Sequence, residues 1–304
     1  MIIIFVLIMI GVYLYKKNHL SNASTRQLSW IIVNITNPIT LLCAALSEEQ
    51  KVSAAEVGIA FLSFAVMYAI LIPLAYLIPK LLGVAKENRY AYHMLAIFGN
   101  VGFIGIPFSA AVLGSGSLIF VSLCGLTFNM IIYTYGVASL KKVSALQHPE
   151  EECEDKFSPL NVINSGTVMA VVTVLVYLLD IKVPDGVSTT LTYIANCTTF
   201  LSMLVLGVSV AQMVPKEVFK RWRLYVFVVI RQILVPILLI FLFRPFIKNE
   251  LILKTIAVMS AMPAANLPLM MAKQYNVRED LISAGIILTT VTSIITIPIV
   301  MYFL

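Results

Sequence analysis

Charged residues are what this sequence has least of. Asp, Glu, Lys and Arg make up 12% of its 304 residues, whereas hydrophobic residues make up 60%. Soluble domains carry about 25% charged residues, so a soluble globular protein is excluded. The long apolar stretches are poor in acids, and Arg231 is the one charged residue deep within them. The composition therefore predicts an all-α polytopic protein of the lipid bilayer, since helices satisfy their own backbone hydrogen bonds in lipid.

Cysteine is scarce as well. The four cysteines are Cys43, Cys124, Cys153 and Cys197, and none has a spacing typical of a metal site. We expect free thiols, no bound metal and no cofactor. The apolar stretches lack an HExxH motif, a buried Asp pair and a Ser/His/Asp set, so the chain is predicted not to be an enzyme. The net charge of +6 belongs to loops and does not indicate a nucleic-acid partner.

Apolar stretches of about membrane length are abundant by contrast. The initial apolar run lacks a positive leading segment and a small-residue cleavage site, so we expect a retained helix instead of a signal peptide. Most of the 21 Lys and Arg residues lie in loops on one side of the spans, which places that side in the cytoplasm. Both termini are therefore predicted to be extracellular, in a multi-pass protein of the plasma membrane. The predicted spans are 1–15, 27–46, 54–78, 88–112, 117–140, 161–180, 188–213, 223–246, 251–273 and 279–303.

The two halves of the chain repeat each other weakly. ILIPL in the third span resembles ILVPI in the eighth, and Pro107 in the fourth span corresponds to Pro268 in the ninth. Because each half has five spans, an odd number, the second half is predicted to be inserted upside down relative to the first. The predicted parts are a first repeat at 1–140, a cytoplasmic polar linker at 141–160 and a second repeat at 161–304.

The linker contains an acidic run within residues 149–156. A solvated cytoplasmic loop is the favoured interpretation, because runs of like charge repel and stay hydrated. A regulatory or metal-binding role for Cys153 and its acidic neighbours has little support in the sequence, because Cys153 has no spacing typical of a metal site.

Two short stretches interrupt the fourth and ninth spans in the same way. They are FGNVGFIGIPF at 98–108 and SAMPAANLPLM at 260–270. Proline lacks a backbone N–H but suits the first turn of a new helix, so Pro107 and Pro268 are predicted to start half-helices that run from residues 108 and 269. Broken backbone survives in lipid only where protein or a cavity surrounds it. Two matched breaks therefore point to a transporter's binding site.

The two breaks together are predicted to bind an anion. If they cross near the middle of the membrane, two helix N-termini face one ligand, each with free N–H groups and about half a positive charge. Asn100 and Asn266 can add amide donors, while Gly99, Gly102 and Gly105 let a ligand approach the backbone. The alternative is that the prolines only kink their helices. The predicted binding residues are Asn100, Val101, Gly102, Gly105, Pro107, Pro263, Asn266, Leu267 and Pro268.

Three residues in other spans are predicted to support this site. Arg231 in the eighth span is a buried membrane charge, which indicates function. It can pair with backbone carbonyls, with Gln232 or with a bound anion. Asn37 in the second span and Thr199 in the seventh either line the path or hydrogen-bond between helices, which is the commoner use of such residues.

At these residues the sequence resembles the auxin efflux carrier family, which includes bacterial members and the plant PIN carriers. GNVGFIGIPF is similar to that family's broken fourth helix, and AMPAANLPLMMAKQYNVREDLISAGII is similar to its ninth-helix region. VIRQILVPI resembles its eighth helix and LSMLVLGVSVAQ its seventh. The resemblance spans nearly the whole chain, and its ninth-helix stretch is the most specific part.

The resemblance implies ten helices in two inverted five-helix repeats, with helices 4 and 9 broken and crossing as in bile acid/sodium symporters. It also implies a scaffold of helices 1, 2, 6 and 7, a transport group of helices 3–5 and 8–10, elevator-type alternating access, and a homodimer through helices 2 and 7. Substrate contact carries over to Asn100, and the crossing prolines carry over to Pro107 and Pro268. Gly99 stands where the family pattern has proline, and helices 2 and 3 lack the charged residues that support the site in some plant carriers.

We therefore expect a secondary active or facilitative transporter of small organic anions, such as malate- or malonate-like carboxylates or auxin-like acids. One alternative is a sodium-coupled organic anion symporter, which the scarcity of acids within the spans disfavours. Another is a membrane sensor that binds such anions without moving them, because binding without flux looks the same in a sequence. The expected partners are the organic anion, the lipid bilayer and a second copy of the chain.

Overall fold

The computed structural model describes residues 2–46, 53–147, 163, 165–211, 222–275, 277 and 280–304. Within these residues all regular secondary structure is helical, and the extended backbone contributes a single isolated bridge, between Gly99 and Ala264. Cys153 and the acidic run at 149–156 lie outside the described residues. The described cysteines, Cys43, Cys124 and Cys197, are free thiols.

The first half of the chain folds into α-helices whose ends follow local sequence signals. Ser53 precedes α4 and accepts a hydrogen bond from the Glu56 N–H, while the Glu56 carboxylate accepts one from the Ser53 N–H, which makes a complete capping box. The chain turns after α4 at Gly83, whose φ of 60° is left-handed. The helices are α1 (Ile2–Lys16), α2 (Asn22–Ile31), α3 (Asn37–Leu46), α4 (Ala54–Leu81), α5 (Arg89–Ile97), α6 (Ile106–Val112), α7 (Leu118–Ile131) and α8 (Val137–Gln147).

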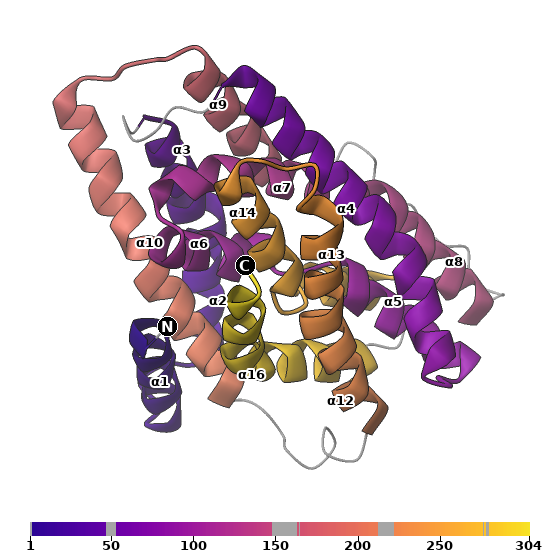
Figure 1. The fold of residues 1–304 in the computed structure, drawn as a ribbon. Helices are drawn as coiled ribbons and strands as arrows, with labels where there is room; N and C mark the ends of the chain where they lie inside the picture. Colours follow the sequence, from indigo (N-terminus) through magenta and orange to yellow (C-terminus); the bar gives the residue numbers. More distant parts are fainter. Residues whose placement is uncertain are drawn as a thin grey trace.

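The second half repeats this mixture of long and short helices. Asn249 caps α14 by accepting hydrogen bonds from the N–H groups of Leu251 and Ile252. Figure 1 shows α10 and α4 as long rods at the outside of the molecule, with α6, α14 and α16 between them. The helices are α9 (Ser165–Leu178), α10 (Asp185–Ala211), α12 (Trp222–Val229), α13 (Val235–Phe243), α14 (Glu250–Ala261), α15 (Leu267–Gln274) and α16 (Asp280–Tyr302).

Helix is present in the described part of each predicted span, with breaks in the fourth and ninth, and the described residues contain six helical stretches long and apolar enough to cross a membrane. A multi-pass membrane protein is therefore confirmed. The other predicted spans are shorter or broken helices, so their crossing of the bilayer stays a prediction. The six stretches are Ala23–Leu46, Ala54–Leu81, Ser115–Gln147, Asp185–Val208, Trp222–Phe243 and Asp280–Tyr302.

In the described part of the chain four helices contain a widened, π-helical turn, and three of these turns end shortly before a proline. The turns η1 (Ile32–Thr36), η3 (Val101–Gly105) and η7 (Ile230–Leu234) each end two residues before Pro38, Pro107 or Pro236. Proline has no N–H to donate, and its ring clashes with the preceding turn. A wider turn makes room for the ring and tolerates the missing hydrogen bond, so the helix continues. The fourth turn, η5 (Ile132–Gly136), has no proline after it.

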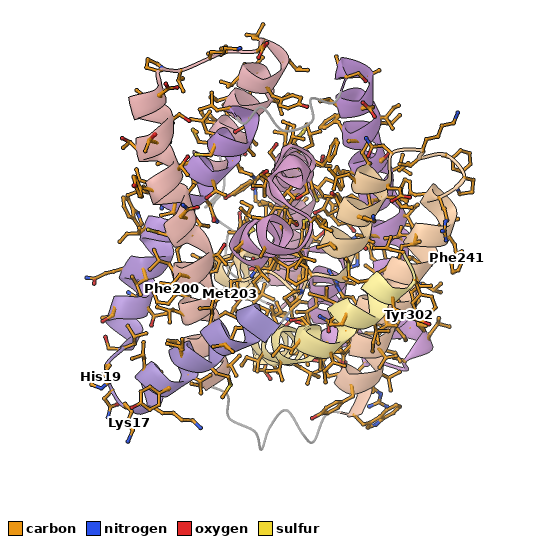
Figure 2. The ribbon with its side chains drawn as sticks, turned by 60° about the vertical axis from the view of Figure 1, so that its left-hand side comes forward. Lys17, His19, Phe200, Met203, Phe241 and Tyr302 are labelled. Atoms are coloured by element: carbon orange, nitrogen blue, oxygen red, sulfur yellow. The ribbon has the colours of Figure 1, made fainter. Side chains whose placement is uncertain are left out.

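Helix α1 packs tightly against α10 through two glycines. A Cβ atom on Gly11 would overlap the Leu204 carbonyl oxygen, and one on Gly207 would overlap the Ile8 carbonyl oxygen. Any larger residue at either position would have to separate the two backbones. Phe200 and Met203, both labelled in Figure 2, lie one turn apart on α10, and Phe200 is exposed whereas Met203 is buried.

Candidate functional site

The two sequence breaks lie together and pair through their backbones. The Asn100 N–H donates to the Pro263 carbonyl oxygen at 2.7 Å, and the Ala265 N–H donates to the Phe98 carbonyl oxygen at 2.9 Å. These bonds flank the antiparallel bridge between Gly99 and Ala264. Each break therefore satisfies backbone groups that the other break frees, which is how irregular backbone is tolerated at membrane depth.

The first break is capped by its own asparagine. Asn100 is the N-cap of the helical segment that resumes at Val101, and its Oδ1 atom accepts a hydrogen bond from the Phe103 N–H at 3.0 Å. The expectation that Pro107 starts this half-helix is wrong. Pro107 is the second residue of α6, after the turn η3, because the π-helical turn accommodates the proline inside the helix.

The second break is held by a threonine from another helix. The Ala264 N–H donates to Thr289 Oγ1 of α16 at 3.1 Å. Pro268 is the second residue of α15, close to the predicted start of that half-helix. Asn266, the sequence counterpart of Asn100, is exposed at this break. Asn100 and Asn266 thus occupy matching positions in the sequence, but Asn100 caps a helix whereas Asn266 is exposed.

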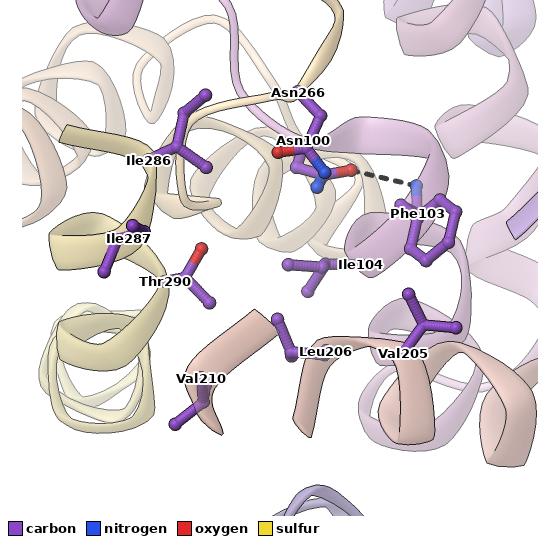
Figure 3. A pocket seen from close by; sticks show the side chains of 10 residues that line it. All are labelled: Asn100, Phe103, Ile104, Val205, Leu206, Val210, Asn266, Ile286, Ile287 and Thr290. Carbon is purple, nitrogen blue, oxygen red and sulfur yellow. Dashed lines mark hydrogen bonds between the residues drawn. The ribbon is translucent and has the colours of Figure 1, made fainter. Parts of the chain in front are cut away.

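A cavity of ≈ 40 Å³ opens beside the paired breaks. Figure 3 shows Asn100 and Asn266 at one end of it, with residues of α16 and α10 forming other walls. The volume holds a few water molecules at most, so an organic acid needs a wider form of the cavity. Its lining residues are Asn100, Phe103, Ile104, Val205, Leu206, Val210, Asn266, Ile286, Ile287 and Thr290.

Three uncommitted polar groups face this cavity. Asn100 uses Oδ1 for its cap, which leaves its Nδ2 group to donate elsewhere. Within the described part of the chain, no hydrogen bond engages Asn100 Nδ2, the Asn266 side chain or the Thr290 hydroxyl. The remaining walls are apolar. The arrangement suits a ligand with a polar head that accepts hydrogen bonds and an apolar body.

The structure separates the predicted binding residues into two groups. Asn100 and Asn266 line the cavity, whereas the others build the breaks around it. Gly105 is placed by packing, because a Cβ there would meet the Met259 sulfur at 3.1 Å. Gly102 has open space around it and offers its carbonyl oxygen to Asn37. The residues of this second group are Val101, Gly102, Gly105, Pro107, Pro263, Leu267 and Pro268.

Arg231 lies behind the breaks and does not line the cavity. Its side chain is 2% exposed. Its Nε atom donates to the Leu95 carbonyl oxygen at 3.3 Å and its Nη1 atom to the Ser260 carbonyl oxygen at 2.6 Å. Of the partners open from the sequence, the structure therefore selects backbone carbonyls. Gln232 turns instead to α16, where its amide donates to the Thr289 carbonyl oxygen and accepts from Thr292.

The predicted support from the second and seventh spans has two different forms. Asn37 Nδ2 donates to the Gly102 carbonyl oxygen at 2.9 Å, which ties α3 to the first break. Thr199 is half-buried and outside the cavity lining, whereas its neighbour Thr198 is buried and bonds Thr40 of α3 at 2.7 Å. Asn37 and Thr198 therefore form hydrogen bonds between segments, whereas no such bond is described for the predicted Thr199.

Several cavity residues were absent from the sequence prediction. Val205, Leu206 and Val210 come from α10, and Ile286, Ile287 and Thr290 come from α16. They are ordinary apolar or hydroxyl residues in long apolar helices, so no local signal distinguishes them from lipid-facing neighbours. The resemblances were the one pointer: LSMLVLGVSVAQ contains the three residues of α10, and the ninth-helix stretch ends at Ile286 and Ile287 of α16, whereas Thr290 lies outside both.

Comparison with known proteins identifies a membrane transporter. The family model described as a membrane transport protein matches residues 1–301. A protein of Methanocaldococcus jannaschii, described as an uncharacterized transporter, is 24% identical over 308 residues, which cover 97% of this chain and 95% of that protein. Because the family match extends over the whole chain, this protein belongs to the membrane transport protein family, the auxin efflux carrier-like transporters.

Proposed function

We propose that this membrane transporter is a secondary active or facilitative carrier of small organic anions, with its site at the paired breaks. The observation that carries the proposal is the convergence of Asn100 Nδ2, the Asn266 amide and the Thr290 hydroxyl, all without partners in the described residues, on one otherwise apolar cavity. Amide and hydroxyl donors bind carboxylate oxygens, and an apolar wall accepts the carbon skeleton.

The charge of the surroundings supports an anion as the ligand. The cavity lining contains no Asp or Glu. Asn100 also begins a helical segment, whose N-terminal end carries a partial positive charge. A carboxylate is therefore favoured over a cation of the same size.

The position of the cavity supports transport by an elevator movement. Its walls come from α10 on one side and from the breaks and α16 on the other. In the proposed ten-span inverted repeat, α10 is the seventh span and belongs to the scaffold group, which consists of spans 1, 2, 6 and 7. The two breaks lie in the fourth and ninth spans and α16 is the tenth, so they belong to the transport group, which consists of spans 3–5 and 8–10. At ≈ 40 Å³ the cavity is too small for an organic acid, so the groups have to move apart for loading.

The rest of the proposed arrangement follows from the basic loops and the family. The protein lies in the plasma membrane with both termini extracellular, and two copies associate through helices 2 and 7. In support, the outward side of α10 presents Tyr193 and Phe200 as exposed aromatic residues.

Flux of radiolabelled malonate, malate and indole-3-acetate into proteoliposomes tests the proposal. We expect uptake of at least one of these acids by the wild type and a loss of about tenfold or more in Asn100→Ala. Asn34→Ala is the matched control, because Asn34 is exposed, lies outside the cavity lining, and its Nδ2 group donates to the Trp30 carbonyl oxygen of its own helix. Equal flux in wild type and Asn100→Ala would contradict the site.

Two further outcomes separate the alternatives. Uptake that requires an inward sodium gradient would identify a sodium-coupled organic anion symporter. An acid that raises the melting temperature of the purified protein but is not taken up would identify a membrane sensor.

A further inference from the structure

Arg231 brings a formal positive charge into the interior of the protein. The side chain is 2% exposed, and within the described residues no carboxylate forms an ion pair with it. A charge held in a membrane protein without a counter-charge is costly, and such charges pair with other groups or with a ligand. The question is what balances this one.

The backbone contacts of Arg231 stabilise the guanidinium without neutralising it. Leu95 lies in the last turn of α5 and Ser260 in the last turn of α14. Both helices end at the breaks, so the guanidinium caps the partly negative C-terminal ends of the two first half-helices. These ends are dipoles with no net charge, so among the described residues the positive charge of Arg231 is uncompensated.

This charge lies directly behind the cavity. A Cβ atom on Gly99 would lie 3.1 Å from Arg231 Nη2, and the next residue, Asn100, lines the cavity. Successive Cα atoms are about 3.8 Å apart, which places the guanidinium within roughly 10 Å of a ligand at Asn100. Gly99 is the residue that leaves room for this approach, since a larger side chain would displace the guanidinium.

We propose that Arg231 is the counter-charge of the bound anion and acts through the break without touching the ligand. This inference rests on the proposed function and extends it: the site selects a ligand by its negative charge, and a monoanion leaves the loaded site electrically neutral. Two unit charges about 10 Å apart at an effective dielectric constant of about 20 change affinity by roughly tenfold to twentyfold.

Binding measurements on purified protein test the charge separately from the shape of the site. The probes are indole-3-acetate and malonate, each compared with its uncharged amide, indole-3-acetamide and malonamide. For whichever acid binds the wild type, we expect the affinity to fall in Arg231→Gln: roughly tenfold to twentyfold for the monoanion indole-3-acetate, and by more for malonate, which carries two negative charges. The amides should bind Arg231→Gln and wild type within about twofold of each other. Equal affinity of Arg231→Gln and wild type for the acid would overturn the inference.

Arg231→Lys keeps the charge and loses the two-carbonyl clamp, so it decides the matter if Arg231→Gln does not fold. Retained preference for acid over amide in Arg231→Lys supports a role for the charge. Equal loss of acid and amide binding shows that the clamp geometry alone matters and overturns the inference. A wild type that binds none of the four probes would overturn the proposed function and this inference together. That result differs from the two above, in which the wild type binds an acid and only the role of Arg231 fails.

Discussion

The two breaks match in sequence, but different parts of the molecule hold them. The first break is capped from within by Asn100, and its Gly102 carbonyl oxygen accepts a hydrogen bond from Asn37 on α3. The second break has its Ala264 N–H satisfied by Thr289 on α16, while Asn266 stays exposed. Two breaks that match in sequence are thus stabilised in different ways.

The difference indicates which break is committed to the scaffold. In the proposed division, α3 belongs to the scaffold and α16 to the transport group. In that division, Asn37 ties the first break to the scaffold group, and Thr289 ties the second break within the transport group. Substitutions of the residues that stabilise each break distinguish the two, and Thr289 is expected to matter most for stability and Asn266 least.

Thr289→Val should have the largest effect on stability. The substitution leaves the buried Ala264 N–H without an acceptor, which costs about 1–3 kcal/mol of unfolding free energy. Thermal and denaturant unfolding in detergent measures this loss. Thr290→Val is the control, because the Thr290 hydroxyl has no partner in the described residues, and we expect its unfolding free energy to stay within about 0.5 kcal/mol of wild type. Equal loss in both variants would contradict the assigned role of Thr289.

Asn100→Ala should lower stability less and transport more. Removal of a helix N-cap costs about 1 kcal/mol, and the cavity also loses a donor. Asn100→Asp separates the two roles, because a carboxylate can still accept from the Phe103 N–H but repels an anion. We expect near-wild-type melting of Asn100→Asp together with a flux reduced at least about tenfold. Full flux in Asn100→Asp would speak against anion contact at this residue.

Asn37→Ala tests the tie between α3 and the first break. The Gly102 carbonyl oxygen loses its side-chain donor, so we expect a loss of about 1 kcal/mol in unfolding free energy. Asn34→Ala removes an exposed amide from the preceding turn η1 and should stay within about 0.5 kcal/mol of wild type. The comparison fails if both variants unfold alike in the same detergent.

Asn266→Ala should have the smallest effect on stability. Asn266 is exposed and forms no side-chain hydrogen bond in the described part of the chain, so we expect a change below about 0.5 kcal/mol. Its role is at the cavity, and ligand affinity is the quantity that should change. If calorimetry instead finds a stability loss as large as that of Asn100→Ala, the two asparagines hold their breaks in equivalent ways.

Much of the architecture was predictable because its causes are local. A run of apolar residues predicts a helix wherever it occurs, and helix is present in the described part of each such run. Pro107 and Pro268 located the breaks because proline disturbs the turn beside it. The position of Pro107 gave a wrong prediction of where the helix resumes. The helical segment already begins at Val101, because a π-helical turn precedes the proline, and hydropathy does not predict such a turn.

The sequence by itself determined that the chain lies in a membrane, where its helices are interrupted and that one arginine is buried among them. Only the tertiary structure decided the partners: Pro263 for Asn100, Thr289 for Ala264, and two helix ends for Arg231. The physical reason is that both the lipid-facing and the protein-facing sides of a membrane helix are apolar, so periodicity does not tell which side meets a neighbour. The hydrogen bonds that join the breaks form between distant segments, and the fold alone brings those segments together.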